Sequence, residues 1–251
     1  MQYKDYTAAL LDLVFPPRCV ACDRYLQAFS KETLCRQCLA GVTRMRPPCC
    51  PLCGIEIESA DDVPHLCGAC LKKPPPYTAA RSLFHYQGPV RTIVSRLKYA
   101  GDLSVKRAIK ALVGDHIATF FADCDLIVPV PLHRKKLRQR GFNQSMLIAE
   151  ICFENHKKRI KPTLLRRNVA TVPQVSLDAK RRRKSLKNVF SLADGVDVQG
   201  LSVGLVDDVF TTGTTVAECA RVFRKNGAAR VLVFTLARTV EQKTQAVLEV
   251  V

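Results

Sequence analysis

Beyond residue 76 the chain alternates short apolar runs with segments of helical period. The apolar runs have the length and β-branched content of buried strands, and they predict strands over 81–86, 125–130, 189–192, 203–206 and 230–236. The segments between them predict helices over 89–98, 103–121, 142–153 and 214–225, the last ended by Asn226 and Gly227. This alternation is typical of an α/β domain with a mostly parallel sheet flanked by helices.

The first 76 residues have a different composition. Nine of the 12 cysteines occur before residue 71, and the chain then passes through Lys72, Lys73 and three prolines at 74–76. A proline run favours extended backbone and cannot continue a helix or a central strand. We therefore expect two parts: residues 1–76, with a short N-terminal helix and a cysteine-rich module, and residues 77–251, with the α/β domain.

The cysteines form four C-x-x-C pairs. Each pair places two thiolates on one tight turn, and two such turns supply the four sulfurs of a tetrahedral zinc site. Gly54, directly after the third pair, allows the backbone to turn so that amides point at the sulfurs. The spacing predicts two zinc ribbons in series, each with a structural Zn²⁺, and the ligands Cys19, Cys22, Cys35, Cys38 and Cys50, Cys53, Cys67, Cys70.

Other arrangements of the cysteines are open at this point. A disulfide framework would require an oxidising compartment, which nothing in the sequence suggests. The pairs could also interleave across the two halves, one site could be vestigial, or His65 could replace a thiolate. Cys49, next to a predicted ligand, is expected to take no part in metal binding.

Basic residues are concentrated in the second part. The formal net charge is +17, to which residues 1–76 contribute only +1. This excess exceeds what solubility requires and makes a polyanionic partner a candidate. No apolar stretch approaches the roughly 18 residues of a membrane helix, and we find no export signal. We therefore expect neither membrane insertion nor an exported precursor.

The most informative segment is 203–215. An apolar run precedes two carboxylates and a loop of threonines and glycine that enters an amphipathic helix. Helix-terminal amides and hydroxyls suit a phosphate monoester, and paired carboxylates suit ribose hydroxyls with Mg²⁺ nearby. The alternative is a capped helix after an edge strand, with solvated carboxylates. We predict a sugar-phosphate site made by Asp207 and Asp208 and by a phosphate loop of Thr211, Thr212, Gly213, Thr214 and Thr215.

Three basic segments, 134–140, 157–167 and 180–187, hold 17 cations and no acid. One small ligand cannot contact so many cations, whereas binding to a nucleic acid backbone gains from counterion release. No groove-reading motif is visible, which favours single-stranded DNA or RNA over duplex, with Phe142 and Phe190 as candidates for base stacking. A solvated face is the alternative. The predicted contacts are Arg134, Lys135, Lys136, Arg138, Arg140, Lys180, Arg182, Arg183 and Lys184.

The segment 203–215 resembles the phosphoribosyl pyrophosphate (PRPP) signature of type I phosphoribosyltransferases. Further motifs are Arg-Gln-Arg-Gly-Phe-Asn-Gln at 138–144, Thr-Val-Pro-Gln-Val-Ser-Leu at 171–177 with Arg181, and Asn-Val-Phe at 188–190. With the double C-x-x-C module upstream, the chain closely resembles the ComF family of competence proteins, ComFC type. The resemblance extends from about residue 10 to about residue 240.

The resemblance implies a bacterial cytoplasmic protein with a type I phosphoribosyltransferase-like domain behind a double zinc ribbon. It places the ribose hydroxyls on Asp207 and Asp208 and a mobile flap, including Arg181, over 168–188. It also implies a role in natural transformation, in which single-stranded DNA is handled near a ComFA-like helicase and the uptake machinery. A pyrophosphate loop is implied at Val130, Pro131, Leu132 and His133, where we expect His133 to position neighbours rather than act as a base.

The leading hypothesis is a competence factor that binds PRPP, with Mg²⁺, and single-stranded DNA. If transfer occurs, pyrophosphate is displaced at the anomeric carbon, but the sequence identifies neither a catalytic residue nor an acceptor. One rival hypothesis is a metabolic phosphoribosyltransferase whose cations collect anionic substrate. Another is a zinc-ribbon adaptor with an inactive sugar-phosphate site.

Overall fold

The computed structural model describes residues 16–27, 30–97, 103–114, 119–168 and 189–240. Its centre is a four-stranded sheet in the order β1-β6-β5-β2, in which all neighbouring strands are parallel. The central strands β5 and β6 are mostly buried and apolar because both faces of the sheet are covered. The four strands are β1 (Ala79–His85), β2 (Leu126–Pro129), β5 (Ser202–Phe210) and β6 (Arg230–Arg238).

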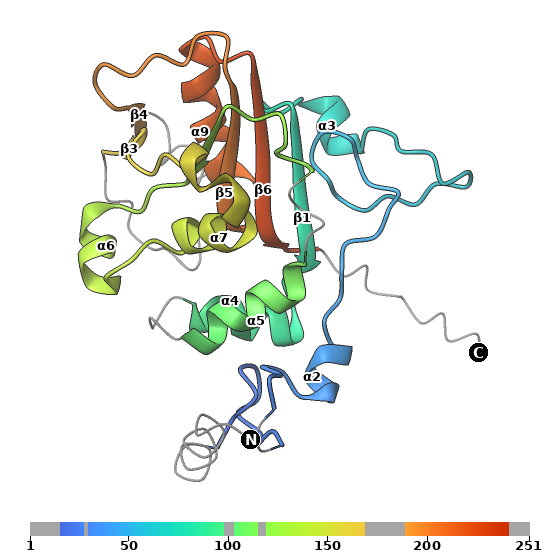
Figure 1. The fold of residues 1–251 in the computed structure, drawn as a ribbon. Helices are drawn as coiled ribbons and strands as arrows, with labels where there is room; N and C mark the ends of the chain where they lie inside the picture. Colours follow the sequence, from blue (N-terminus) through green and yellow to red (C-terminus); the bar gives the residue numbers. More distant parts are fainter. Residues whose placement is uncertain (1–15, 28–29, 98–102, 115–118, 169–188, 241–251) are drawn as a thin grey trace.

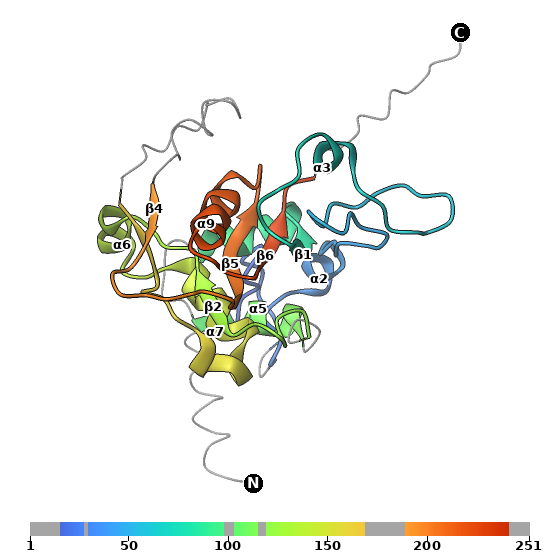
Figure 2. The same ribbon diagram turned by 90° about the horizontal axis from the view of Figure 1, so that it is seen from above.

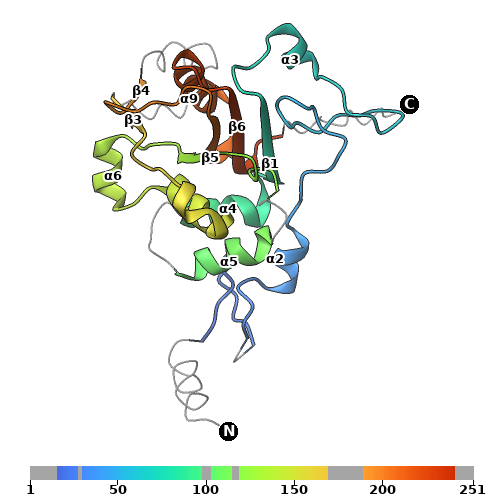
Figure 3. The ribbon, with the colours of Figure 1, turned by 45° about the horizontal axis from the view of Figure 1, so that its top comes forward.

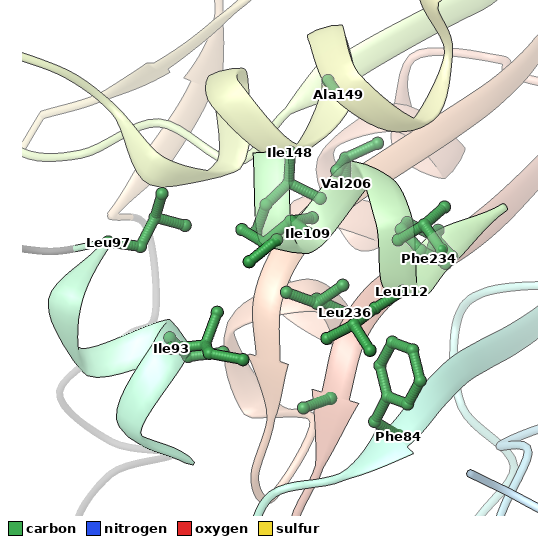
Figure 4. Close-up of a cluster of buried hydrophobic side chains, with 14 of the residues drawn as sticks. Phe84, Ile93, Leu97, Ile109, Leu112, Ile148, Ala149, Val206, Phe234 and Leu236 are labelled. Carbon is green, nitrogen blue, oxygen red and sulfur yellow. The ribbon is translucent and has the colours of Figure 1, made fainter. Parts of the chain in front are cut away.

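Helices cover both faces of this sheet (Figures 1 and 2). Three of them, α4 (Gly88–Arg96), α5 (Leu103–Val113) and α7 (Gln144–Cys152), pack on one face, and α9 (Thr214–Lys225) packs on the other. Alternate residues of β5 contribute to the two cores, Leu205 on the α9 side and Val206 on the opposite side (Figure 4). The predicted α/β class with a parallel sheet is confirmed.

The remaining elements are short and lie around this core. A two-stranded antiparallel sheet joins β3 (Leu165–Arg167) and β4 (Phe190–Leu192), and η1 (Glu154–Arg159) is a 3-10 helix after α7. No helix within the described residues combines the length and the hydrophobicity needed to cross a membrane. The short helices around the core are α2 (Arg36–Ala40), α3 (Gly68–Lys72) and α6 (Arg134–Arg140).

Two predicted element boundaries are wrong. The helix predicted over 103–121 ends at Val113, because Gly114 adopts a positive φ of 59° that breaks the helix, and residues 119–123 form turns. The strand predicted to end at residue 206 continues to Phe210, because β6 pairs with it through the acidic pair, where Asp207 faces Thr235. The two aspartates therefore lie on the last part of the strand, not after it.

Two other predictions are corrected by the fold. The strand predicted over 189–192 does not join the parallel sheet but pairs with β3 as β4. The basic run 134–140, interpreted only through its charge, is a helix. Its arginines, lysines, leucine and glutamine are all good helix formers, and Gly141, with a positive φ of 78°, ends the helix.

The cysteine module docks on the open edge of β1. Residues 43–45 run beside this strand, where the Met45 amide donates to the Leu83 carbonyl over 2.8 Å and the His85 amide donates to the Thr43 carbonyl over 2.9 Å. These bonds cover a sheet edge that would otherwise expose unpaired amides and carbonyls. The two parts of the chain are therefore joined by backbone pairing as well as by the proline segment.

Candidate functional site

The acidic pair lies at the carboxyl end of β5, where open α/β sheets commonly bind ligands. Each carboxylate is held by backbone: the Asp208 amide donates to Asp207 Oδ1 over 2.9 Å, and the Val209 amide donates to Asp208 Oδ1 over 2.7 Å. Both aspartates are half-buried, and neither forms an ion pair within 4.0 Å among the described residues. Within the described part of the chain, no salt bridge therefore neutralises the charge of this pair.

The two aspartates differ in their surroundings. The carboxyl group of Asp207 is withdrawn from water, although the residue as a whole is half-buried. This burial and the neighbouring charge of Asp208 raise the pKa of Asp207 to about 7, against opposing hydrogen bonds from the Asp208 amide and Ser145 and the charge of Arg167. Asp207 therefore changes protonation near neutral pH and would be stabilised as a carboxylate by a cation or hydroxyl donor.

Ser145 reaches the acidic pair from α7. Its hydroxyl donates to Asp207 Oδ1 over 3.0 Å, and its own amide donates to Asn143 Oδ1 over 3.0 Å at the N-cap of the helix. Asn143 also donates through Nδ2 to the Val130 carbonyl over 3.0 Å. The motif at 138–144 therefore fixes the start of α7 between β2 and β5. No local sequence motif marks Ser145 as part of the site.

The phosphate loop leads from β5 into α9. Gly213 is the N-cap residue of α9, has a positive φ of 69° and supplies no side chain to cap the helix. Within the loop, the hydroxyls of Thr212 and Thr214 are 2.7 Å apart, while Thr211 and Thr212 are exposed. First-turn amides of a helix, together with its dipole, favour an anion. The structure thus brings the predicted loop and the predicted acidic pair together.

The predicted pyrophosphate loop follows β2, the neighbour of β5. The Val130 amide donates to the Val206 carbonyl over 2.8 Å, so residues 130–133 begin beside the acidic pair. Val130 is buried, whereas Pro131, Leu132 and His133 are half-buried. His133 caps α6, because its Nδ1 accepts from the Lys135 amide over 3.1 Å.

The helix α6 presents a basic surface near this end of the molecule. Arg134, Lys135 and Arg138 are exposed, Lys136 and Arg140 are half-buried, and the helix has no acidic residue. Figures 1 and 2 show α6 beside the β3–β4 sheet, away from the zinc-ribbon module. The other predicted cations, Lys180, Arg182, Arg183 and Lys184, and the predicted flap with Arg181 lie outside the described residues.

Part of the basic segment 157–167 makes contacts within the fold, although Lys157, Lys158, Lys161 and Arg166 are exposed. Arg159 donates to the Ala122 carbonyl over 2.7 Å, and Arg166 pairs with Asp194 over 2.7 Å. Phe190, named as a candidate for base stacking, is 6% exposed and belongs to the core on the α9 side. Phe142, the other candidate, is half-buried.

The eight predicted metal ligands gather into two groups, and no pairs interleave. Within each group the four sulfur atoms lie within 4.8 Å of one another, and the Sγ atoms of Cys22 and Cys35 and of Cys53 and Cys67 are 3.7 Å apart. Tetrahedral zinc with bonds of about 2.3 Å requires sulfurs about 3.8 Å apart, so both groups fit a structural Zn²⁺. The groups are Cys19, Cys22, Cys35, Cys38 and Cys50, Cys53, Cys67, Cys70.

Backbone amides support the sulfur atoms in both groups. Burial opposes ionisation of Cys50, but amides of Cys53, Cys67 and Leu52 outweigh it and lower the pKa of this thiol to about 6. Cys19 has the same balance and a pKa of about 6. His65 belongs to neither group, and Cys49 instead donates through Sγ to the Arg46 carbonyl over 3.2 Å. Both four-cysteine groups thus have the donor set and support of zinc-ribbon sites.

Comparison with known proteins matches both parts of the chain. Residues 10–71 match the double zinc ribbon domain family. The chain is 36% identical over 232 residues to DNA utilization protein YhgH of Salmonella typhimurium, covering 90% of this chain and 99% of that protein. It is 32% identical over 235 residues to Competence protein F of Haemophilus influenzae, covering 88% and 96%.

A solved structure is similar over part of the chain. A purine phosphoribosyltransferase from Pyrococcus horikoshii Ot3 aligns with 20% identity and a TM-score of 0.33, covering 56% of this chain and 86% of that protein. The assignment of family rests on the sequence relatives, which align over nearly their whole length, and on the two four-cysteine groups. This chain belongs to the ComF family, which includes Competence protein F and DNA utilization protein YhgH.

Proposed function

We propose that this protein binds a PRPP-type sugar phosphate at the carboxyl end of β5 and single-stranded DNA on an adjacent basic surface, in the bacterial cytoplasm. We further propose that residues 1–76 are a structural double zinc ribbon and that residues 77–251 carry both binding activities. The names of the relatives, a competence protein and a DNA utilization protein, support a role in DNA uptake or use.

The sugar-phosphate proposal depends mainly on one observation, the position of the acidic pair next to the N-terminus of α9. Two carboxylates on β5 and uncapped amides at Gly213 and beyond are separated by only the short phosphate loop. Carboxylates accept hydrogen bonds from vicinal hydroxyls, while helix-terminal amides donate to phosphate oxygens. A ribose 5-phosphate carries both vicinal hydroxyls and a phosphate group.

The charge of the acidic pair supports a role for Mg²⁺ when PRPP is bound. Burial of Asp207 and the charge of Asp208 raise the pKa of Asp207 to about 7. Ionising both carboxylates is therefore costly unless a cation lies nearby. Mg²⁺ would accompany the pyrophosphate group and neutralise part of its charge. Residues 130–133, next to β5, are the proposed contacts for that pyrophosphate.

The DNA proposal depends on α6 in the described part of the chain. Its five cations lie on one short helix with no acid, and three of them are exposed. Self-repulsion of such a helix is relieved when a polyanion replaces small counterions. In the segment 157–167, Lys157, Arg159 and Arg166 bond to other residues of the fold, and Glu154 lies next to the segment. We therefore assign the described DNA contacts to Arg134, Lys135, Lys136, Arg138 and Arg140.

Calorimetric titration with PRPP and Mg²⁺ tests the sugar-phosphate proposal. Wild-type protein should bind PRPP. The double variant Asp207→Asn, Asp208→Asn should lose at least about tenfold in affinity, because it has no carboxylates to accept hydrogen bonds from the ribose hydroxyls. Absence of binding by the wild-type protein would instead support the zinc-ribbon adaptor. Turnover with a base acceptor and no DNA affinity would support the metabolic transferase.

Salt-dependent DNA binding tests the second proposal. The affinity for a single-stranded oligonucleotide should fall steeply with salt, and Lys135→Gln with Arg138→Gln should reduce the slope of log affinity against log salt by about 1.4, near 0.7 for each phosphate contact. Lys72→Gln with Lys73→Gln is the matched control, since it removes two exposed cations from the zinc-ribbon part. Equal slopes for both variants would reject α6 as the DNA contact.

A further inference from the structure

We propose that Arg238 is a positioning residue that couples the second four-cysteine site to the phosphate loop. The site in question is the group of Cys50, Cys53, Cys67 and Cys70. The inference rests on the proposed function, because it concerns how the sugar-phosphate site is held in shape. Through this coupling, the zinc ribbon acts on ligand affinity by way of one buried arginine.

Arg238 is the last residue of β6 and is 6% exposed. Its Nη1 donates to the carbonyl of Cys53, a predicted metal ligand, and its guanidinium carbon lies 4.2 Å from the centre of the Phe210 ring. No carboxylate lies within 4.0 Å of Arg238 among the described residues. A buried cation therefore bridges the metal site and an aromatic face.

The metal site supplies the charge that this arginine needs. Four thiolates around one Zn²⁺ carry a net charge of about −2, and thiolates of such a group are ionised by the metal. Metal loading therefore stabilises Arg238 in its buried position, since an unpaired buried charge is costly.

Phe210 transmits this position to the phosphate loop. It is the last residue of β5, and its ring lies directly against Gly213, where a Cβ atom would come within 2.4 Å of Phe210 Cζ. Tyr77 packs edge-on against the same ring, with ring centres 6.5 Å apart. A shift of the ring would therefore move Gly213, whose backbone begins α9 and carries the proposed phosphate contacts.

The turn that carries Cys50 and Cys53 is fixed on β1 from the other side. The Ala80 amide donates to the Leu52 carbonyl over 2.7 Å, and Arg81 donates to the Pro51 carbonyl over 3.1 Å. Gly54 fits so closely that a Cβ atom would lie 2.3 Å from the Ala80 carbonyl oxygen. Because this turn is rigidly docked, the Cys53 carbonyl offers Arg238 a fixed acceptor as long as the metal holds the turn together.

The first four-cysteine site has no such connection in the described structure. Its ribbon, which includes α2, packs near α4 on a different side of the molecule (Figures 1 and 3), and Arg96 of α4 pairs with Asp23 there. Val20 of this ribbon belongs to the core on the α4 and α5 side, not to the core beneath α9. The two metal sites are therefore expected to differ in their effect on the ligand.

The test is the variant Arg238→Gln, with Arg96→Gln as a matched arginine control that loosens the first ribbon. In zinc-loaded protein, Arg238→Gln should weaken PRPP affinity about tenfold, while Arg96→Gln should leave it within about twofold. Arg238→Lys, which keeps a buried cation and a donor, should recover part of the loss. The ligand-free amide resonance of Gly213 should move in Arg238→Gln but not in Arg96→Gln, a change that loss of stability alone would not produce.

The outcomes separate the two proposals. If wild-type protein binds no PRPP, the proposed function fails, and the Gly213 resonance still decides the coupling. If Arg238→Gln retains zinc, binds PRPP within about twofold of wild type and leaves the Gly213 resonance in place, the coupling is rejected. If Arg238→Gln does not fold, Arg238→Lys replaces it, because it leaves the Phe210 ring in place but changes the contacts with that ring and the Cys53 carbonyl, and the same two readouts apply.

Discussion

The hydroxyl of Ser145 donates to Asp207 Oδ1 over 3.0 Å across a separation of 62 residues. This bond connects the start of α7 with the acidic end of β5 and opposes the burial that raises the pKa of Asp207. It also leaves the second oxygen of the carboxylate without a side-chain donor among the described residues. Asp207 is thus held through Oδ1 by one side chain and one backbone amide of the protein.

Removal of the Ser145 hydroxyl should weaken the sugar-phosphate site. Ser145→Ala is expected to reduce PRPP affinity about tenfold, because a hydrogen bond to a partly buried carboxylate contributes about 1.5–3 kcal/mol. Titration calorimetry measures the change. The control is Ser191→Ala. Ser191 lies on β4 of the small antiparallel sheet, and its hydroxyl is hydrogen-bonded to Asn168. Similar losses in both variants would contradict a specific role for Ser145.

The raised pKa of Asp207 predicts a pH-dependent stability. The carboxyl ionises near 3.8 in an unfolded chain but near 7 in the folded protein, so the folded state binds the extra proton between these values. Its contribution to stability is present in full below pH 3.8 and is lost as the pH rises through about 7. Asp207→Asn should therefore be more stable relative to wild type at pH 8 than at pH 5.

Urea unfolding at both pH values measures this relative stability. Asp208→Asn is a useful comparison, because it removes the neighbouring charge and should lower the pKa of Asp207. The free energy of unfolding of Asp208→Asn should therefore fall less steeply between the two pH values than that of wild type. A constant difference between Asp207→Asn and wild type would contradict the assigned pKa.

Substitution of two adjacent cysteines should affect the zinc content differently. Cys50 belongs to the second four-cysteine group, whereas Cys49 instead contacts the Arg46 carbonyl. Cys50→Ser should lose about one equivalent of zinc and lower the melting temperature of the zinc-ribbon part, since structural zinc contributes folding free energy. Cys49→Ser should keep both equivalents. Elemental analysis with thermal unfolding checks this, and zinc loss in Cys49→Ser would show that the ligand set is wrong.

Close packing at Gly204 should make this position intolerant of a methyl group. Gly204 lies in the centre of β5, and a Cβ atom there would lie 2.7 Å from the ring of Phe121, which is fully buried. Gly204→Ala should destabilise the protein by about 1–3 kcal/mol in urea unfolding. Gly68→Ala is the control, because no atom lies within 4 Å of a Cβ atom at that position. A neutral Gly204→Ala would mean that the aromatic ring has room to move.

Periodicity and spacing were enough to identify the main local features. The strands that become β2, β5 and β6 are mostly apolar, so burial on both faces follows from composition, whereas β1 alternates buried and half-buried residues. The C-x-x-C pairs act locally as well, because two residues between thiols already place both sulfurs on one turn. The predicted phosphate loop is local as well, since residues 211–215 are consecutive, but the positive φ of Gly213 came only from the structure.

Contacts between distant segments were decided only by the tertiary structure. Neither Ser145 nor Arg238 belongs to a local motif that names its partner, since serine and arginine occur in many surroundings and their bonds to Asp207 and Cys53 span 62 and 185 residues. The extension of β5 through its acidic pair likewise needed the neighbouring β6. The sequence alone determined which groups could bind metal, sugar or phosphate, because side-chain chemistry is local. The packing of the sheet decided which of these groups meet, because hydrogen bonds and aromatic contacts act only over a few ångströms in space.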